Sequence, residues 1–141
     1  MPIEQLFKLD QLELALQVLR SPDVPYQFFP AARRAAEELG VIQDENAITR
    51  LTPEQYLALR STVIRSFRTT FTRWLTLENF YNAICIQLEY CRHRNNTVVD
   101  VATRISDAIS GVLNLPEEVA NPLTVLVISI KSLDLFCGCD V

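Results

Sequence analysis

The stretch that decides the fold is LTVLVISIKSLDLF, residues 123–136. Its β-branched portion VLVISI, residues 125–130, fits either a buried strand or a helix that is apolar on all sides. A strand needs a partner strand, and no other segment of the chain has a convincing strand pattern. We therefore predict a buried central helix. Lys131, Asp134 and the short length argue against a membrane span, which takes roughly 20 apolar residues.

The rest of the chain also carries helical patterns. Thr52 is placed to cap a helix whose first residue is Pro53, and Thr76 is placed to cap the next one. Short connections predict a compact all-α bundle of five to six helices. We expect a single helical domain over residues 1–136, followed by a short C-terminal tail at 137–141. The predicted helices cover residues 3–20, 30–39, 53–75, 77–94, 98–113 and, after a start at 117 and an interruption at Pro122, 123–136.

The first predicted helix has two apolar stripes. One consists of Leu9, Leu12, Leu16 and Leu19, and the other of Ile3, Phe7, Leu14 and Val18. A helix with one stripe packs against one core, whereas two stripes need two partners. The leucine stripe therefore either lies between two layers of the same domain or meets a second molecule, most commonly in a two-fold dimer. These four leucines are the candidate partner interface.

Charge is unevenly distributed along the chain. The formal net charge is -4, but residues 60–104 carry seven Lys or Arg and only three Asp or Glu. This basic segment either complements the acidic flanks within the fold or presents a basic face to an anionic partner. The candidate anion-binding residues are Arg60, Arg65, Arg68 and Arg73. They do not form one stripe, so a nucleic-acid partner is less favoured.

Arg60 differs from the other three arginines because it lies near the centre of the apolar face of its predicted helix. A buried guanidinium must be paired or hydrogen-bonded. We therefore expect Arg60 to be mostly buried and bonded to a carboxylate or to backbone carbonyls, or to face an anion-binding cleft.

Few residues indicate catalysis. The one histidine, His93, lies between Arg92 and Arg94, which supply no carboxylate to orient it. No glycine-rich loop is present to hold phosphates, and no nucleophile motif is present. The sequence thus favours a protein that is not an enzyme, and it predicts no catalytic residue and no cofactor.

The four cysteines are the remaining candidates for chemistry. Cys85 and Cys91 lie on or near the inner face of their predicted helix, where free cysteines pack as small apolar groups. Cys137 and Cys139 lie in the predicted tail, which we expect to be inert and outside the core. Two alternatives give this tail a role. In the first, its two cysteines join Cys91 and His93 to form a Cys3His zinc site, although the cysteine spacing does not match that of the usual zinc knuckles. In the second, its two cysteines are redox-active.

These observations favour one functional hypothesis over two others. The favoured one is a non-enzymatic helical protein–protein interaction module that self-associates, as a homodimer, through its N-terminal helix. The first alternative is a small binding domain for an anionic ligand or nucleic acid through residues 60–104. The second is a zinc or thiol-redox protein that uses the C-terminal Cys-Gly-Cys. The charged N-terminal sequence lacks the apolar core of a secretion signal, so we expect a cytoplasmic protein with no membrane partner.

Overall fold

The computed structural model describes residues 2–130, 133 and 137–139. Over these residues the chain is a compact all-α bundle, which confirms the predicted fold class. In chain order the elements are α1 (Ile3–Leu6), α2 (Gln11–Arg20), the 3-10 helix η1 (Tyr26–Phe28), α3 (Pro30–Glu38), the 3-10 helix η2 (Glu45–Arg50), α4 (Pro53–Leu75), α5 (Glu78–Tyr81), the π-helix η3 (Asn82–Gln87), α6 (Tyr90–His93), α7 (Val98–Leu113) and α8 (Glu117–Ile130).

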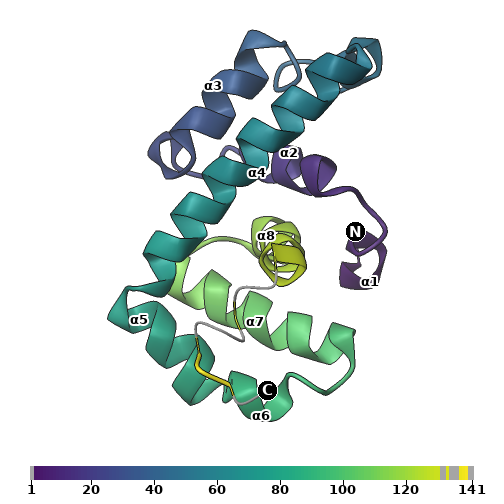
Figure 1. Cartoon of the computed structure of the whole chain (residues 1–141). Helices are drawn as coiled ribbons and strands as arrows, with labels where there is room; N and C mark the ends of the chain where they lie inside the picture. The colour runs from purple at the N-terminus through teal and green to yellow at the C-terminus, as the bar shows by residue number, and fades with distance from the viewer. Residues whose placement is uncertain (1, 131–132, 134–136, 140–141) are drawn as a thin grey trace.

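Helix α8 forms the centre of the bundle. Figure 1 shows it nearly end-on, with α1, α2, α4 and α7 around it, and all four contact it. Every residue from Pro122 to Val127 is buried. Because successive helical residues point about 100° apart, six buried residues in a row require cover on all sides. Residues 125–130 are therefore helix, as predicted, and not strand.

Pro122 does not interrupt this helix, contrary to the prediction. It lies inside α8, which runs without a break from Glu117 to Ile130. A proline removes the hydrogen bond to the carbonyl four residues before it, here that of Glu118. Glu118 is exposed in the first turn, where water is available to satisfy that carbonyl. The loss is therefore small enough for the helix to continue.

Helix α2 is covered on both of its apolar stripes. It packs against α8 and also against α4. Leu12, Leu16 and Leu19 are at most 1% exposed, and Leu9 is half-buried against the core. Of the two alternatives that the sequence left open, the structure matches the one in which helices of the same chain cover this stripe. It does not support the predicted partner interface at Leu9, Leu12, Leu16 and Leu19.

Two of the predicted helices are broken into shorter pieces. The segment 3–20 divides into α1 and α2. The turn between them places the carboxylate of Asp10 against α4, where it accepts a hydrogen bond from the hydroxyl of Tyr56. The segment 77–94 divides into α5, η3 and α6, and the left-handed backbone at Glu89, with φ 54°, ends the π-helical stretch.

Helix α4 begins with the predicted cap. The Thr52 hydroxyl accepts a hydrogen bond from the Gln55 backbone N–H at 3.1 Å, and the Gln55 side chain accepts one from the Thr52 N–H at 2.9 Å. Its inner face carries an aromatic cluster. The rings of Phe67 and Phe29 stack with centroids 3.9 Å apart, and Trp74 stacks on Phe80 at 5.8 Å. These contacts fix α4 against both α3 and α5.

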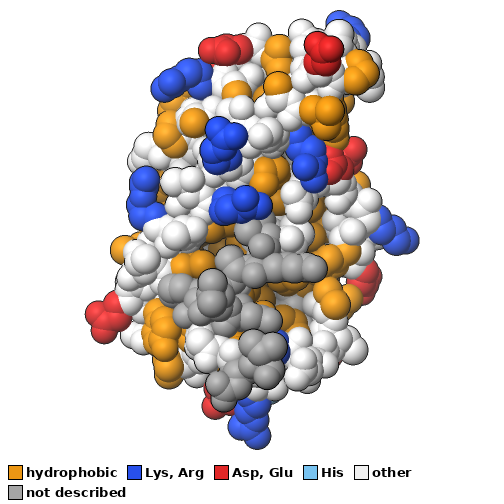
Figure 2. Space-filling view, viewed as in Figure 1, with side chains coloured by type: hydrophobic (Ala, Val, Ile, Leu, Met, Phe, Trp, Pro, Cys, Tyr) orange, Lys and Arg blue, Asp and Glu red, His pale blue; other side chains and the backbone are white. Residues whose placement is uncertain are grey.

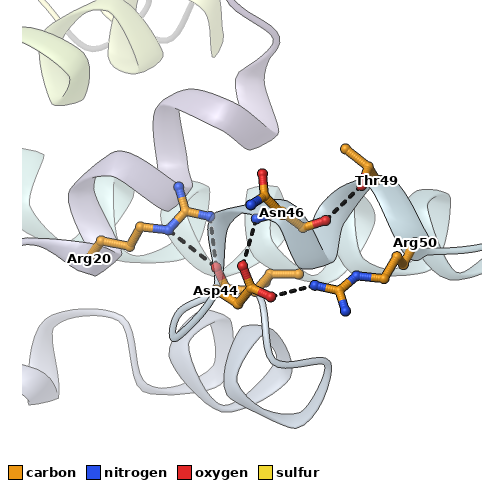
Figure 3. Close-up of polar contacts among 6 residues, drawn as sticks. Arg20, Asp44, Asn46, Thr49 and Arg50 are labelled. Atoms are coloured by element: carbon orange, nitrogen blue, oxygen red, sulfur yellow. Dashed lines mark hydrogen bonds and ion pairs between the residues drawn. The ribbon is translucent and has the colours of Figure 1, made fainter.

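The connection from α3 to α4 is held by polar contacts that Figure 3 shows. The Arg20 guanidinium donates two hydrogen bonds to the Val41 carbonyl, at 2.7 and 3.2 Å. The Asp44 carboxylate accepts a hydrogen bond from the Asn46 N–H at 3.0 Å and pairs with Arg50. Asp44 therefore caps η2 and fixes the chain just before it enters α4.

Two disulfides join the C-terminal segment to the rest of the bundle. Cys85 of η3 is bonded to Cys137, and Cys91 of α6 is bonded to Cys139, with Cα atoms 5.3 Å apart in each pair. The prediction of free cysteines and an inert tail was wrong. Cys137 is half-buried against the core, because the chain returns to η3 and α6 after α8. Within the described ranges, every helix is too short or too polar to cross a bilayer.

We expect α2 to contribute to stability through its leucine stripe. Leu16→Ala should lower the free energy of unfolding by about 3 kcal/mol, since it leaves a cavity between α2 and its neighbours. Leu57→Ala is the matched control, because Leu57 is 65% exposed and should change stability by less than about 0.5 kcal/mol. Urea unfolding measures both. Equal effects of the two variants would contradict the burial of this stripe.

The disulfides lead to a second stability prediction. Cys137→Ser with Cys139→Ser opens two loops whose ends are 52 and 48 residues apart. In the chain-entropy model, closing either loop lowers the entropy of the unfolded chain and so stabilises the folded state by about 4 kcal/mol. Because the two loops overlap, their stabilising effects do not add fully. We expect the oxidised wild type to exceed the double variant by about 3–5 kcal/mol, and reduced wild type to resemble the variant. An unchanged denaturation midpoint would mean that the two disulfides do not stabilise the fold.

Candidate functional site

The exposed side of α4 is basic. Arg65, Arg68 and Arg73 are exposed, while Val63 and Phe67 face the core. The chain has no Asp or Glu between Glu54 and Glu78, and this stretch covers almost the whole helix. Figure 2 shows Lys and Arg side chains spaced over this side of the molecule, above α3 and α4. Four of the seven basic residues in the basic segment predicted from the sequence therefore lie on this one helix.

Two grooves flank this surface. The first, the α3–α4 groove, lies between α4 and the η1–α3 segment and has a volume of about 360 Å³. Its polar lining includes Gln27, Thr62, Arg65, Thr69 and Arg73. The second, the Arg68 groove, has a volume of about 430 Å³. It is lined by Leu57, Arg60, Ser61, Ile64, Arg65 and Arg68.

Arg65 lines both grooves, and no described carboxylate lines either one. The guanidinium groups of Arg65, Arg68 and Arg73 make no hydrogen bond or ion pair with any residue that the structure describes. Within the part of the chain that the structure describes, these charged donors have no acceptor and remain available to an anion from solution.

Arg60 is different, because its charge is already paired. Its Nε donates to the Asp10 carboxylate at 3.3 Å, and its Nη2 donates to the Gln11 side-chain oxygen at 3.2 Å. The predicted charge-assisted hydrogen bond is thus confirmed. The predicted burial is only partial, since 39% of the Arg60 side chain is exposed. With Asp10 beside it, Arg60 is the weakest of the four anion-binding candidates.

Asp10 also shapes the electrostatics at this end of α4. Burial alone raises the pKa of Asp10, but the hydrogen bond from Tyr56 and the charge of Arg60 outweigh it, so its pKa is lower than the ordinary value. The same hydrogen bond raises the pKa of Tyr56 to about 12. Asp10 therefore stays ionised at neutral pH and neutralises Arg60.

Two hydrogen bonds hold the walls of the α3–α4 groove together. The Ala32 N–H donates to the Ser66 hydroxyl at 3.3 Å, and the Thr70 hydroxyl donates to the Phe28 carbonyl at 3.1 Å. The Phe28 ring also meets the edge of Trp74, with centroids 5.2 Å apart. The η1–α3 wall is thus fixed against α4, and the groove is formed before any ligand arrives.

Sequence reasoning missed Arg33, a buried arginine of α3. It is 7% exposed, donates one hydrogen bond to the Leu19 carbonyl at 2.8 Å, and lies over the Tyr26 ring at 5.0 Å. The Leu19 carbonyl belongs to the last turn of α2, which favours a positive charge. Arg33 therefore joins α3 to the end of α2. No signal in the pattern AARRAA distinguishes it from its exposed neighbour Arg34.

The zinc set considered from the sequence does not assemble. Cys91, Cys137 and Cys139 are all in disulfides, and a disulfide sulfur has no thiolate to offer a metal. His93 instead has its Nδ1 within 3.2 Å of the Asn96 side-chain nitrogen. Among the described residues, no group of three or more potential ligands is placed to hold a metal ion.

Comparison with known proteins adds no functional information. No protein-family model, no curated protein and no solved structure matches this chain.

We expect the contribution of Asp10 to stability to depend on pH. The folded pKa is below the ordinary value of 3.8, so the contribution is present above about pH 4 and lost as the pH falls through the folded pKa. Asp10→Asn should therefore lower the free energy of unfolding at about pH 6 and have a smaller effect at about pH 2. Asp23→Asn, in an exposed turn, is the control. An equal effect of Asp10→Asn at both pH values would contradict this assignment.

Proposed function

We propose that this protein is a binding module for an anionic ligand and that the outer face of α4 is its binding surface. The observation that carries the proposal is the set of three exposed guanidinium groups, Arg65, Arg68 and Arg73, with no carboxylate partner among the described residues. Planar guanidinium donors match the oxygen pairs of phosphate, sulfate and carboxylate groups. Unpaired arginines along one helix thus favour an external anion.

Binding through α4 is favoured over self-association through the N-terminal helix. The burial of Leu12, Leu16 and Leu19 removes the surface on which self-association rested. The arginines, in contrast, lie at the surface and line two grooves. A protein partner remains compatible with this face only if it presents acidic groups, and an acidic peptide is one of the probes below.

The ligand is a compact anion rather than a long nucleic acid. The whole chain carries a net charge of -4, which repels an extended polyanion beyond the basic face. The basic face itself is about one helix long, and its three exposed arginines have no acceptor among the described residues. A short ligand contacts this face without meeting the acidic flanks.

The two disulfides support a compartment in which thiols are oxidised, rather than the cytoplasm expected from the sequence. Disulfides persist where the environment is oxidising and are rare where glutathione keeps thiols reduced. We expect protein isolated from its native source with rapid alkylation to take up no alkylating reagent before reduction. Four modified cysteines without prior reduction would contradict this proposal.

The binding surface is tested by removing its charges. Arg65→Gln, Arg68→Gln and Arg73→Gln together should weaken binding of inorganic tripolyphosphate at least about tenfold, measured by isothermal titration calorimetry at low salt. The matched control is Arg50→Gln, Arg92→Gln and Arg104→Gln, which changes the net charge equally at exposed sites elsewhere.

The control should bind within about twofold of the wild type. A short polyglutamate peptide and a single-stranded oligonucleotide are run alongside, and each should bind more weakly than tripolyphosphate. Equal weakening in both triple variants would show that net charge alone attracts anions, and the proposal would fail.

A further inference from the structure

We propose that the α3–α4 groove binds the diphosphate group of a small organic molecule, with the organic part against Phe28. This inference rests on the proposed function, because it assigns one of the two grooves and one ligand class to the anion-binding face.

The arginines of this groove are placed to converge on one ligand. Arg65, Thr69 and Arg73 are separated by four residues each, so they follow one stripe of α4. Arg65 and Arg73 lie about 12 Å apart along the helix axis, and Thr69 lies midway between them. Two long side chains at that spacing are able to contact opposite ends of one ligand that lies between them. A diphosphate offers oxygen atoms to both, whereas a single phosphate is short for this span.

The opposite wall adds a backbone donor. The Ala31 N–H belongs to the first turn of α3, where the helix supplies no acceptor, and no described residue accepts from it. The Phe28 carbonyl is already occupied by the Thr70 hydroxyl. Charged donors come from α4 and a backbone donor comes from the first turn of α3, and the side-chain acceptors in the described lining are neutral amide and hydroxyl oxygens. Phosphoryl oxygens, which only accept when ionised, match this lining.

The size and the apolar part of the groove indicate more than an inorganic ion. A volume of about 360 Å³ lies within the range of small-molecule sites, and one water occupies roughly 30 Å³ of liquid. Phe28, Pro30 and Ala31 supply apolar surface next to the arginines. An organic group on the diphosphate would cover this surface, and a planar group would stack on the Phe28 ring.

The two grooves provide the matched control. Arg73 lines the α3–α4 groove and Arg68 lines the Arg68 groove, and both are exposed arginines of the same helix. Thr69→Val removes one hydroxyl of the α3–α4 groove at nearly constant volume. Circular dichroism and thermal unfolding of each variant check that the fold is unchanged, as expected for exposed positions.

The experiment is a calorimetric titration with adenosine diphosphate, inorganic pyrophosphate and adenosine. We expect adenosine diphosphate to bind at least threefold more tightly than pyrophosphate, and adenosine to give no measurable binding. Arg73→Gln should weaken adenosine diphosphate binding at least about tenfold and Thr69→Val about threefold. Arg68→Gln should weaken it by no more than about threefold, because Arg68 belongs to the basic face but does not line this groove.

Each other outcome overturns the inference in a distinguishable way. Equal losses in Arg73→Gln and Arg68→Gln would mean that anions bind diffusely along α4, which refutes the groove assignment and leaves the proposed function standing. Equal affinities for pyrophosphate and adenosine diphosphate would refute the proposed contact between the organic part of the ligand and Phe28. Binding of tripolyphosphate without any binding of the two diphosphates would refute the ligand class alone. Absence of binding for every anion would refute both this inference and the proposed function.

Discussion

The complete burial of α8 is the constraint on which the rest of the structure depends. A helix that is apolar on every side has no face to show to water, so other helices must surround it. Helices α1, α2, α4 and α7 do so, and α2 in turn lies between α8 and α4. The second stripe of α2 exists because of this arrangement. The N-terminal leucines therefore belong to the same core as residues more than one hundred positions later in the chain.

The same core fixes the position of the candidate site. Phe67 on the inner face of α4 stacks on Phe29, which directly precedes α3. Ser66 and Thr70, at the edge of that face, bind the η1–α3 segment by hydrogen bonds. The arginines on the outer face are therefore carried by a helix that is anchored on its other side. A ligand in the α3–α4 groove would meet a surface whose backbone is already in place, which lowers the cost of ordering on binding.

The sequence predicted local features well and long-range pairings poorly. The helical state of residues 125–130, the Thr52 cap and the exposed arginines follow from spacing and composition. The partner of Arg60 is Asp10, fifty residues away, and no spacing rule connects them. The disulfide partners of Cys137 and Cys139 are separated from them by 52 and 48 residues. Cysteine spacing alone leaves such pairings open. Two apolar stripes on one helix likewise indicate two packing partners, but they do not indicate whether the second partner belongs to the same chain.

We propose that α4, anchored by the core around α8, recognises an anion through arginines that have no partner among the described residues. The most direct measurement is the NMR spectrum of the arginine side-chain Nε–H groups during titration with inorganic pyrophosphate. The account predicts saturable shifts of the Arg65 and Arg73 signals, with Arg60 unchanged because Asp10 already accepts its hydrogen bond. Uniform small shifts of all arginines, or no shift at Arg65 and Arg73, would contradict it.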